Sequence, residues 1–242
     1  MRPKAILLDM DDTIISYDHG IDLDLCWKRV CSRHLRLDDA RIGELITEIK
    51  RHAKWYWSDP ERHRTGRLDL DKARTEIVAS ALRLASIHEP AASRRIAVDY
   101  GVERDHEIQP YPGAVETLRQ LRDKGFRLAL LTNGAKLPQR NKIERFGLAP
   151  FFDCILIEEE FGAGKPDERI YLHALDRLGA AADETWMVGD NYEWEIAAPQ
   201  KLGIKGIWIN PKRLGHPSPE LPYRTVSTLS DILPLLDETA VS

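Results

Sequence analysis

Hydrophobic and polar positions follow two different patterns along the chain. From residue 114 onward, short apolar runs alternate with segments of helical periodicity. Runs that are apolar nearly throughout are typical of parallel strands covered on both faces, and they occur at 5–8, 126–133, 152–159, 185–190 and 205–210. Helical spacing occurs at 114–125, 140–148, 167–179 and 193–203, the last interrupted or ended near Pro199, and 224–238 adds a short strand and a helix. This alternation predicts an α/β fold with a doubly wound, Rossmann-like parallel sheet.

The pattern between residues 17 and 108 contains no strand-like runs. Long segments with helical spacing occupy 38–57 and 70–88, and two prolines with a glycine mark a return linker at 107–114. We therefore predict two domains: residues 1–16 with 109–242 form the α/β core, and residues 17–108 form an inserted helical domain. The two hinges are expected near 16–18 and 109–112.

Composition narrows the class of protein. At 242 residues, with 43% hydrophobic and 31% charged residues, the chain can bury one substantial core. The net charge of −4 and the lack of a long basic run argue against nucleic acid as a partner. Because no stretch approaches the roughly 20 apolar residues of a spanning helix, no membrane association is predicted and the expected location is cytoplasmic. The cysteines Cys26, Cys31 and Cys154 suit reduced thiols better than a disulfide framework or a zinc site.

Three aspartates, Asp9, Asp11 and Asp12, follow directly after the first apolar run. Like charges so crowded repel one another, unless they form a solvated turn or a cation lies among them. Ligands of open α/β sheets bind beyond the carboxyl ends of the strands. Thr132, Asn133, Lys165 and Asp190 also stand at or just past strand ends in this pattern. The carboxylates, the lysine and the hydroxyl together predict a Mg²⁺ and phosphate site at that edge.

Four short motifs, in order, give the chain a resemblance to the haloacid dehalogenase superfamily, in its helical-cap branch. They are "DMDDT" at 9–13, "LLTN" at 130–133, "GAGKPDERIY" at 162–171 and "VGDNYEWEI" at 188–196. Each motif alone is weak, but their order at successive strand ends is specific. Position 12, an aspartate here, is often glycine in that superfamily.

The resemblance implies roles for the residues of the first and fourth motifs. Asp9 is the expected nucleophile, forming an aspartyl phosphate that water hydrolyses. Mg²⁺ is expected on the Asp9 carboxylate, the Asp11 backbone carbonyl and the Asp190 carboxylate. Asp11 is the expected general acid and base. Glu195 and Asn191 are expected to support this site, although Glu195 could equally favour a helix dipole.

The second and third motifs are expected to bind the phosphoryl group. Lys165 is expected to place a positive charge beside Asp9, and the Thr132 hydroxyl and Asn133 backbone N–H to donate to phosphoryl oxygens. A solvated lysine on a loop and a structural threonine at a strand end are the alternative interpretations of these positions.

The predicted function is Mg²⁺-dependent hydrolysis of a small phosphorylated metabolite, a phosphate monoester. The acid at Asp11 favours ester cleavage over dehalogenation, because an ester oxygen needs a proton on leaving. A phosphomutase of the same superfamily remains an alternative, and a phospho-acceptor domain or a noncatalytic binding protein fits less well. The segment 54–69, rich in aromatic and basic residues, either packs between helices or lines the substrate cleft.

Overall fold

The computed structural model describes residues 2–215 and 217–238, in two compact units that are described one by one. Unit 1 comprises Met1–His19 with Gln109–Ser242, and unit 2 comprises Gly20–Ile108. The sequence pattern placed the start of the insert at residue 17, whereas residues 17–19 belong to unit 1. The reason is local: the Asp12 carboxylate accepts hydrogen bonds from the backbone N–H groups of all three residues.

Unit 1 is built on a six-stranded parallel sheet with strand order β3-β2-β1-β4-β5-β6. The strands are β1 (Ala5–Leu8), β2 (Arg127–Thr132), β3 (Cys154–Ile157), β4 (Thr185–Gly189), β5 (Lys205–Ile209) and β6 (Arg224–Val226). Their near-continuous apolar runs are explained by burial on both faces, and every residue of β1 is fully buried. The predicted doubly wound parallel sheet is confirmed, and the strand order reverses direction beside β1, between β1 and β4.

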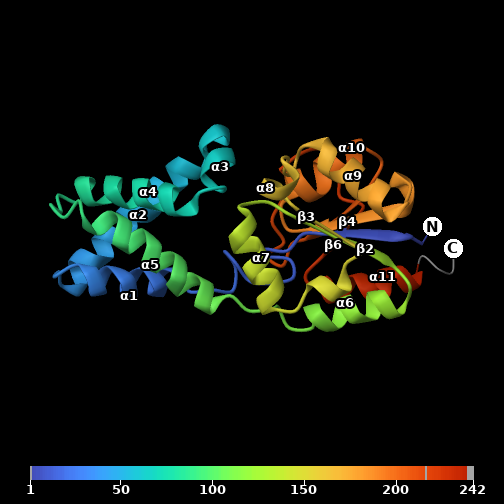
Figure 1. Ribbon diagram of the computed structural model, residues 1–242, viewed down its shortest axis with the longest axis horizontal. Coiled ribbons are helices and arrows are strands. Elements are labelled where there is room, and N and C mark those ends of the chain that lie inside the picture. Colours follow the sequence, from blue (N-terminus) through green and yellow to red (C-terminus); the bar gives the residue numbers. More distant parts are fainter. Residues whose placement is uncertain (1, 216, 239–242) are drawn as a thin grey trace. The chain divides into compact units, whose positions relative to one another are not determined.

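Helices cover both faces of this sheet, with α9 and α10 on one side and α6 and α11 on the other (Figure 1). Their bounds are α6 (Ala114–Asp123), α7 (Lys136–Arg145), α8 (Glu158–Phe161), α9 (Glu168–Leu178), α10 (Ala198–Lys201) and α11 (Ile232–Glu238). Alternate residues of each strand point to opposite faces. Leu7, Leu131 and Met187 therefore share one core cluster with Ile170 and Leu175 of α9.

Three predicted elements differ from the structure in extent. The helix expected at 140–148 begins earlier, at Lys136. The strand expected at 152–159 ends at Ile157, because the short helix α8 starts at once. The helix expected at 193–203 is a π-helical turn at Tyr192–Ala197 followed by α10. Proline at position 199 is tolerated because it lies in the first turn of α10.

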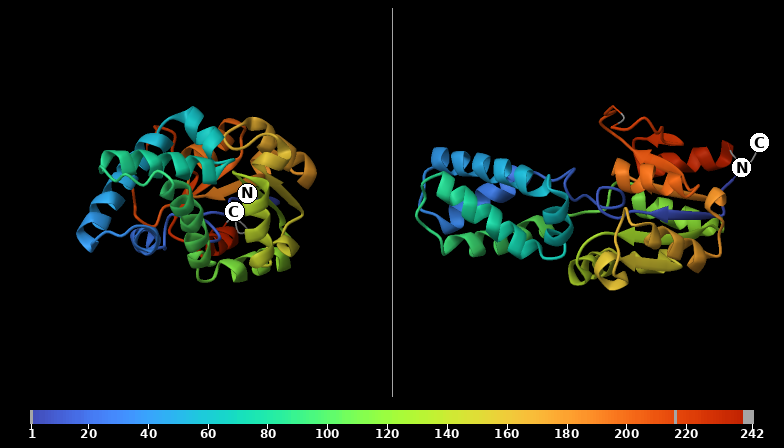
Figure 2. Two further views of the ribbon diagram at one scale, coloured as in Figure 1. Left: turned by 60° about the vertical axis from the view of Figure 1, so that its left-hand side comes forward. Right: turned by 90° about the horizontal axis from the view of Figure 1, so that it is seen from above.

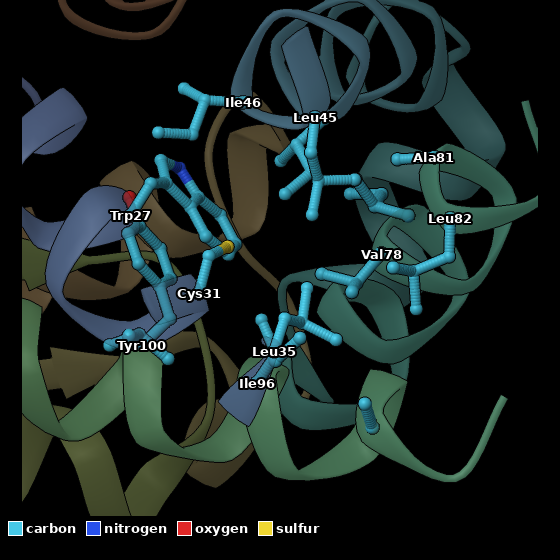
Figure 3. Close-up of a cluster of buried hydrophobic side chains, with 14 of the residues drawn as sticks. Trp27, Cys31, Leu35, Leu45, Ile46, Val78, Ala81, Leu82, Ile96 and Tyr100 are labelled. Carbon is cyan, nitrogen blue, oxygen red and sulfur yellow. The ribbon is translucent and has the colours of Figure 1, made fainter. Parts of the chain in front are cut away.

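Unit 2 is a bundle of helices enclosing its own core (Figures 2 and 3). Its elements are α1 (Leu23–His34), α2 (Asp39–Trp57), α3 (Pro60–Gly66), α4 (Leu70–Leu84) and α5 (Ala92–Glu107). Trp27 of α1 stacks on Tyr100 of α5 with ring centroids 3.5 Å apart, at one end of the buried cluster (Figure 3). Aspartate side chains cap the starts of the first four of these helices.

The aromatic and basic segment at 54–69 divides between core and surface. Tyr56 is buried in the core of unit 2, whereas 49% of Trp55 is exposed. The guanidinium of Arg62 lies 3.8 Å from the centroid of the Trp55 ring, and it donates to the backbone carbonyls of Trp55 and Tyr56 at the end of α2. In the described part of the chain, no helix is both long and apolar enough to span a membrane.

Candidate active site

The first loop of the site continues β1 without a break. The backbone N–H of Asp9 donates to the Val188 carbonyl at 3.0 Å, which extends the pairing of β1 with β4 by one residue. Asp9 is 7% exposed, so its carboxylate stands at the carboxyl edge of the sheet with little contact to solvent. This is the strand end, beside the reversal of strand order, at which ligands bind in open α/β sheets.

Lys165 joins two carboxylates in the interior of unit 1. Its Nζ atom lies 2.6 Å from Oδ1 of Asp9 and 2.7 Å from Oε1 of Glu195, and its side chain has no exposed surface. The second oxygen of Glu195 accepts the backbone N–H of Asn191 at 2.7 Å. Glu195 is therefore a buried partner of Lys165, and not a solvated acid at a helix start. The Asn191 side chain accepts the N–H of Trp194 and caps the π-helical turn.

Burial and charge shift the titration of this cluster strongly. Burial by itself lowers the pKa of Lys165, but the charges of Asp9 and Glu195 outweigh it and raise that pKa, so the ammonium stays charged. Burial raises the pKa of Asp9, an effect that Lys165 only partly offsets. Burial also raises the pKa of Glu195 to about 7. For Asp190, burial together with the charges of Glu195, Asp9 and Asp12 raises the pKa to about 9.

Close packing around Gly189 makes this arrangement possible. A Cβ atom at position 189 would lie 2.2 Å from Cγ of Glu195 and 3.1 Å from Cβ of Asp9. Only glycine therefore lets the end of β4 approach the two carboxylates. The next residue, Asp190, is held by its backbone carbonyl, which accepts the indole N–H of Trp208 on β5 at 2.9 Å.

The second motif lies against the loop that carries Lys165. Thr132 ends β2 and is 1% exposed. The Asn133 side chain donates to the Lys165 carbonyl at 2.7 Å and accepts its backbone N–H at 2.8 Å, a reciprocal pair that fixes the lysine loop to the end of β2. Asn133 was predicted to contact phosphate only through its backbone N–H, so this side-chain role was missed. Glu158, also missed, is buried and accepts the N–H of Gly134 at 2.8 Å.

The Asp11 carboxylate contacts two side chains of α7. The Nζ atom of Lys142 lies 2.7 Å from each oxygen of Asp11, and Nε2 of Gln139 lies 3.0 Å from Oδ2. Gln139 also lies 2.5 Å from Oγ1 of Thr132. Neither α7 residue belongs to a recognisable motif. The sequence pattern predicted this helix only from residue 140, so it did not indicate that Gln139 and Lys142 share a helix face. That becomes clear only once the helix is seen to start at Lys136.

Asp12 has a structural task in the same loop. It adopts a φ of 57°, in the left-handed region that favours glycine and tolerates aspartate. In addition to the three N–H groups of residues 17–19, its carboxylate accepts the hydroxyl of Tyr111 at 3.1 Å. Ligand atoms of Asp12, His19 and Asp190 lie within 4.8 Å of one another. Because Asp12 already accepts hydrogen bonds from four donor groups, its carboxylate is better suited to holding the loop than to binding a metal.

The predicted site residues lie at the carboxyl edge of the sheet, around the ends of β1, β2 and β4. Hydrogen bonds join Lys165 to Asp9, Glu195 and the Asn133 side chain, and join Gln139 to both Thr132 and Asp11. Asp190 lies close enough to Glu195 and Asp9 for their charges, together with burial, to raise the pKa of its carboxyl group. The arrangement offers a nucleophilic carboxylate beside a buried cation, with a hydroxyl donor nearby and more acid groups than Lys165 neutralises.

The sequence of the chain is similar to those of known proteins. The family model of the haloacid dehalogenase-like hydrolases matches residues 3–203. A glyceraldehyde 3-phosphate phosphatase from Methanocaldococcus jannaschii is 38% identical over 203 residues, which cover 83% of this chain and 82% of that protein. A phosphoserine phosphatase from Thermus thermophilus is 34% identical over 226 residues, which cover 86% of this chain and 88% of that protein.

A solved structure shares the fold across the whole chain. The magnesium-bound HAD-hydrolase YfnB from Bacillus subtilis aligns with a TM-score of 0.76 at 22% identity, covering 98% of this chain and 100% of that chain. At this identity the likeness concerns the fold, including the helical insert.

Proposed function

Because this enzyme belongs to the haloacid dehalogenase-like hydrolase family, we propose that it is a Mg²⁺-dependent phosphatase that hydrolyses a small phosphorylated metabolite through an aspartyl phosphate. The observation that carries the proposal is the fully buried ammonium of Lys165, held 2.6 Å from Asp9. A lysine is almost never buried without a charged partner. Here its charge lies where two negative groups, a carboxylate and a phosphoryl group, have to approach each other.

The donor set fits a hard dication. The buried carboxylates of Asp9 and Glu195 and the half-buried carboxylate of Asp190 lie near the ammonium of Lys165, and their pKa values are raised first by burial and then by their mutual repulsion. The Asp9 carboxylate, the Asp11 carbonyl and the Asp190 carboxylate would hold Mg²⁺, which prefers oxygen ligands and shares its shell with substrate phosphate. When bound, the ion neutralises charge on the phosphoryl oxygens.

The reaction then has two displacements at phosphorus. An oxygen of Asp9 attacks phosphorus and the ester P–O bond breaks, while Asp11, which enters this step in its protonated form, transfers its proton to the leaving oxygen, and that oxygen departs as an alcohol. Water next attacks the aspartyl phosphate, Asp11 takes its proton, and Asp9 is regenerated with release of inorganic phosphate. Lys165 and the Thr132 hydroxyl interact with the phosphoryl oxygens in both steps. General acid and base catalysis of this kind contributes about 10²–10⁴-fold.

Unit 2 is proposed to act as a cap that selects the substrate and excludes water. Its two connections to unit 1 are already paired with each other. Ser16 N donates to the Gln109 carbonyl at 2.8 Å, and Tyr111 N donates to the Ile14 carbonyl at 2.9 Å. Because these contacts lie inside unit 1, the two hinges are expected just beyond them, near 19–20 and 108–109, and not at 16–18 and 109–112 as the sequence pattern suggested. Lids of this kind commonly gate substrate entry and product release.

The experiment is a panel of phosphorylated metabolites, beginning with glyceraldehyde 3-phosphate and phosphoserine, which the names of the two relatives suggest. Release of inorganic phosphate is measured with Mg²⁺ and with EDTA, and isomerisation of a hexose phosphate is followed in parallel to detect a mutase. The Asp9→Asn variant keeps the shape of the side chain but removes the nucleophile, so we expect activity to be lost. Asp183→Asn, at an exposed aspartate of unit 1, is the matched control. Full activity of Asp9→Asn would refute the aspartyl phosphate mechanism.

A further inference from the structure

Two buried polar side chains of α7 face the site although no motif includes them. Gln139 and Lys142 lie one helical turn apart, and they are 3% and 8% exposed. Long polar side chains are mostly exposed on helices, so burial of this pair needs polar partners. Those partners are Asp11, Thr132 and the carbonyl of Asn133.

The orientation of the Gln139 amide is fixed by the chemistry around it. The Asp11 carboxylate, 3.0 Å away, and the Asn133 carbonyl, 2.7 Å away, can only accept hydrogen bonds, so the amide must present its NH₂ group to them. The amide nitrogen cannot accept a hydrogen bond, so Thr132 Oγ1, at 2.5 Å from it, is an acceptor too, and three acceptors share the two amide hydrogens. The single hydroxyl hydrogen of Thr132 is thereby left to point elsewhere, and a phosphoryl oxygen is the acceptor that the proposed reaction brings.

Lys142 holds the other end of this arrangement. Its ammonium lies 2.7 Å from both oxygens of Asp11, and only 10% of its side chain is exposed. The ring of Tyr17 has its centroid 4.4 Å from the same nitrogen. Asp11 is therefore held by a bidentate ionic contact and a hydrogen bond, both from one turn of α7.

We propose that Lys142 and Gln139 are positioning residues for the reaction: Lys142 holds the carboxylate of Asp11 in place for proton transfer, and Gln139 links Asp11 to Thr132 and directs the Thr132 hydroxyl to the phosphoryl group. The inference rests on the proposed phosphatase function. It predicts two separable defects, because proton transfer matters only for leaving groups that need a proton, whereas the hydroxyl contacts every phosphoryl group.

The test compares two probes of similar shape, p-nitrophenyl phosphate and phenyl phosphate. The p-nitrophenolate leaves readily without a proton, and phenolate does not. For Lys142→Met we expect kcat/KM to fall by about 10–100-fold with phenyl phosphate and by less than about 3-fold with p-nitrophenyl phosphate. For Gln139→Leu we expect a fall of about 10-fold or more with both probes. Arg140→Met is the matched control, since Arg140 lies on the same helix but pairs with exposed Glu160, and neither probe should be affected.

A double-mutant cycle separates positioning from a general effect on the fold. If Lys142 acts through Asp11, Lys142→Met adds no further loss of kcat/KM in an Asp11→Asn background. Lys142→Gln, a second variant that keeps a polar group, should show the same dependence on the leaving group. Thermal unfolding of each variant identifies any protein that is not folded, and the cycle is then measured with the variant that is.

The outcomes distinguish the inference from the proposed function. Equal losses of Lys142→Met on both probes, or a full additional loss in the Asp11→Asn background, would overturn the positioning role while leaving the phosphatase intact. Retention of activity by Asp9→Asn would instead overturn the proposed function itself.

Discussion

The Nζ atom of Lys165 lies 2.7 Å from Oε1 of Glu195, and neither side chain is more than 1% exposed. The glutamate supplies a negative charge that keeps the lysine protonated in the interior of unit 1. It also explains why Lys165 stands 2.6 Å from Asp9 at a fixed position, since the ammonium is held from two sides. Leaving a buried charge of this kind without a partner lowers the free energy of unfolding.

Replacing Glu195 should separate charge from packing. Glu195→Ala removes one of the two carboxylate partners of a buried ammonium and leaves a cavity, so we expect the free energy of unfolding to fall by about 3–5 kcal/mol. Glu195→Gln keeps an oxygen acceptor of nearly the same shape and should lose less stability. Urea unfolding followed by circular dichroism measures both, and Glu193→Ala, at an exposed position of the same π-helical turn, is the control. A loss below 1 kcal/mol for Glu195→Ala would contradict the assigned pairing.

Replacing Lys165 by methionine should create a protein that acid stabilises. Without the ammonium, the carboxylates of Asp9 and Glu195 remain buried side by side, so protonation relieves the repulsion between them. We expect phosphatase activity to fall by at least about 10²–10³-fold. The midpoint of thermal unfolding of Lys165→Met should rise, relative to the unmodified protein, as the pH is lowered from 8 to 5. Lys201→Met, at an exposed lysine, should show neither effect.

The stability of the metal-free protein should fall as the pH rises. The pKa of Asp190 is raised to about 9 and that of Glu195 to about 7 in the folded state, whereas ordinary carboxyl groups titrate near 4. Between about pH 4 and pH 9 the folded state therefore binds more protons than the unfolded state, and the free energy of unfolding decreases with pH. Thermal unfolding in EDTA from pH 5 to pH 9 measures this slope.

The proposed binding of Mg²⁺ should counteract this loss of stability, because the ion would bind the deprotonated carboxylates. The rise in melting temperature on adding Mg²⁺ should be small at pH 5 and grow toward pH 9. Asp190→Asn should flatten the slope in EDTA and weaken the effect of Mg²⁺, whereas Asp183→Asn should change neither. A metal-free protein whose stability is independent of pH over this range would show that these carboxylates are not buried as described.

Much of the fold could be predicted because the signals were local. The apolar run at 5–8 and the glycine-terminated helix pattern at 167–179 each determine their own element. The π-helical turn at Tyr192–Ala197 could not be predicted in this way. Its geometry places Glu195 against Lys165, a contact across 30 residues that no local periodicity encodes. The early start of α7 was missed because residues 136–139 carry little apolar periodicity.

The residues of the candidate site likewise fall into two groups, those that the sequence indicated and those that it did not. Residues within short motifs, such as Asp9, Thr132 and Asp190, were predicted from their place at or just past strand ends. Residues that act through tertiary contacts were missed: Gln139 and Lys142 reach Asp11 across 128 and 131 residues. Nothing in their neighbours distinguishes these side chains from solvated polar residues of a surface helix, the usual interpretation of such a segment.

Glycine at position 189 should prove irreplaceable for a steric reason. A Cβ there would lie 2.2 Å from Cγ of Glu195 and 3.1 Å from Cβ of Asp9, both atoms of buried side chains that have little room to move. Gly189→Ala should therefore lower the free energy of unfolding by about 1–3 kcal/mol and displace the two carboxylates, with a loss of activity larger than the loss of folded protein.

Gly43→Ala is the matched control: Gly43 is exposed within α2 and has no atom within 4 Å of the added carbon. There the same substitution should stabilise the protein by about 0.5–1 kcal/mol, because alanine favours helix. Thermal unfolding and phosphate release on both variants check the pair, and equal effects would show that β4 does not approach Glu195 as closely as described.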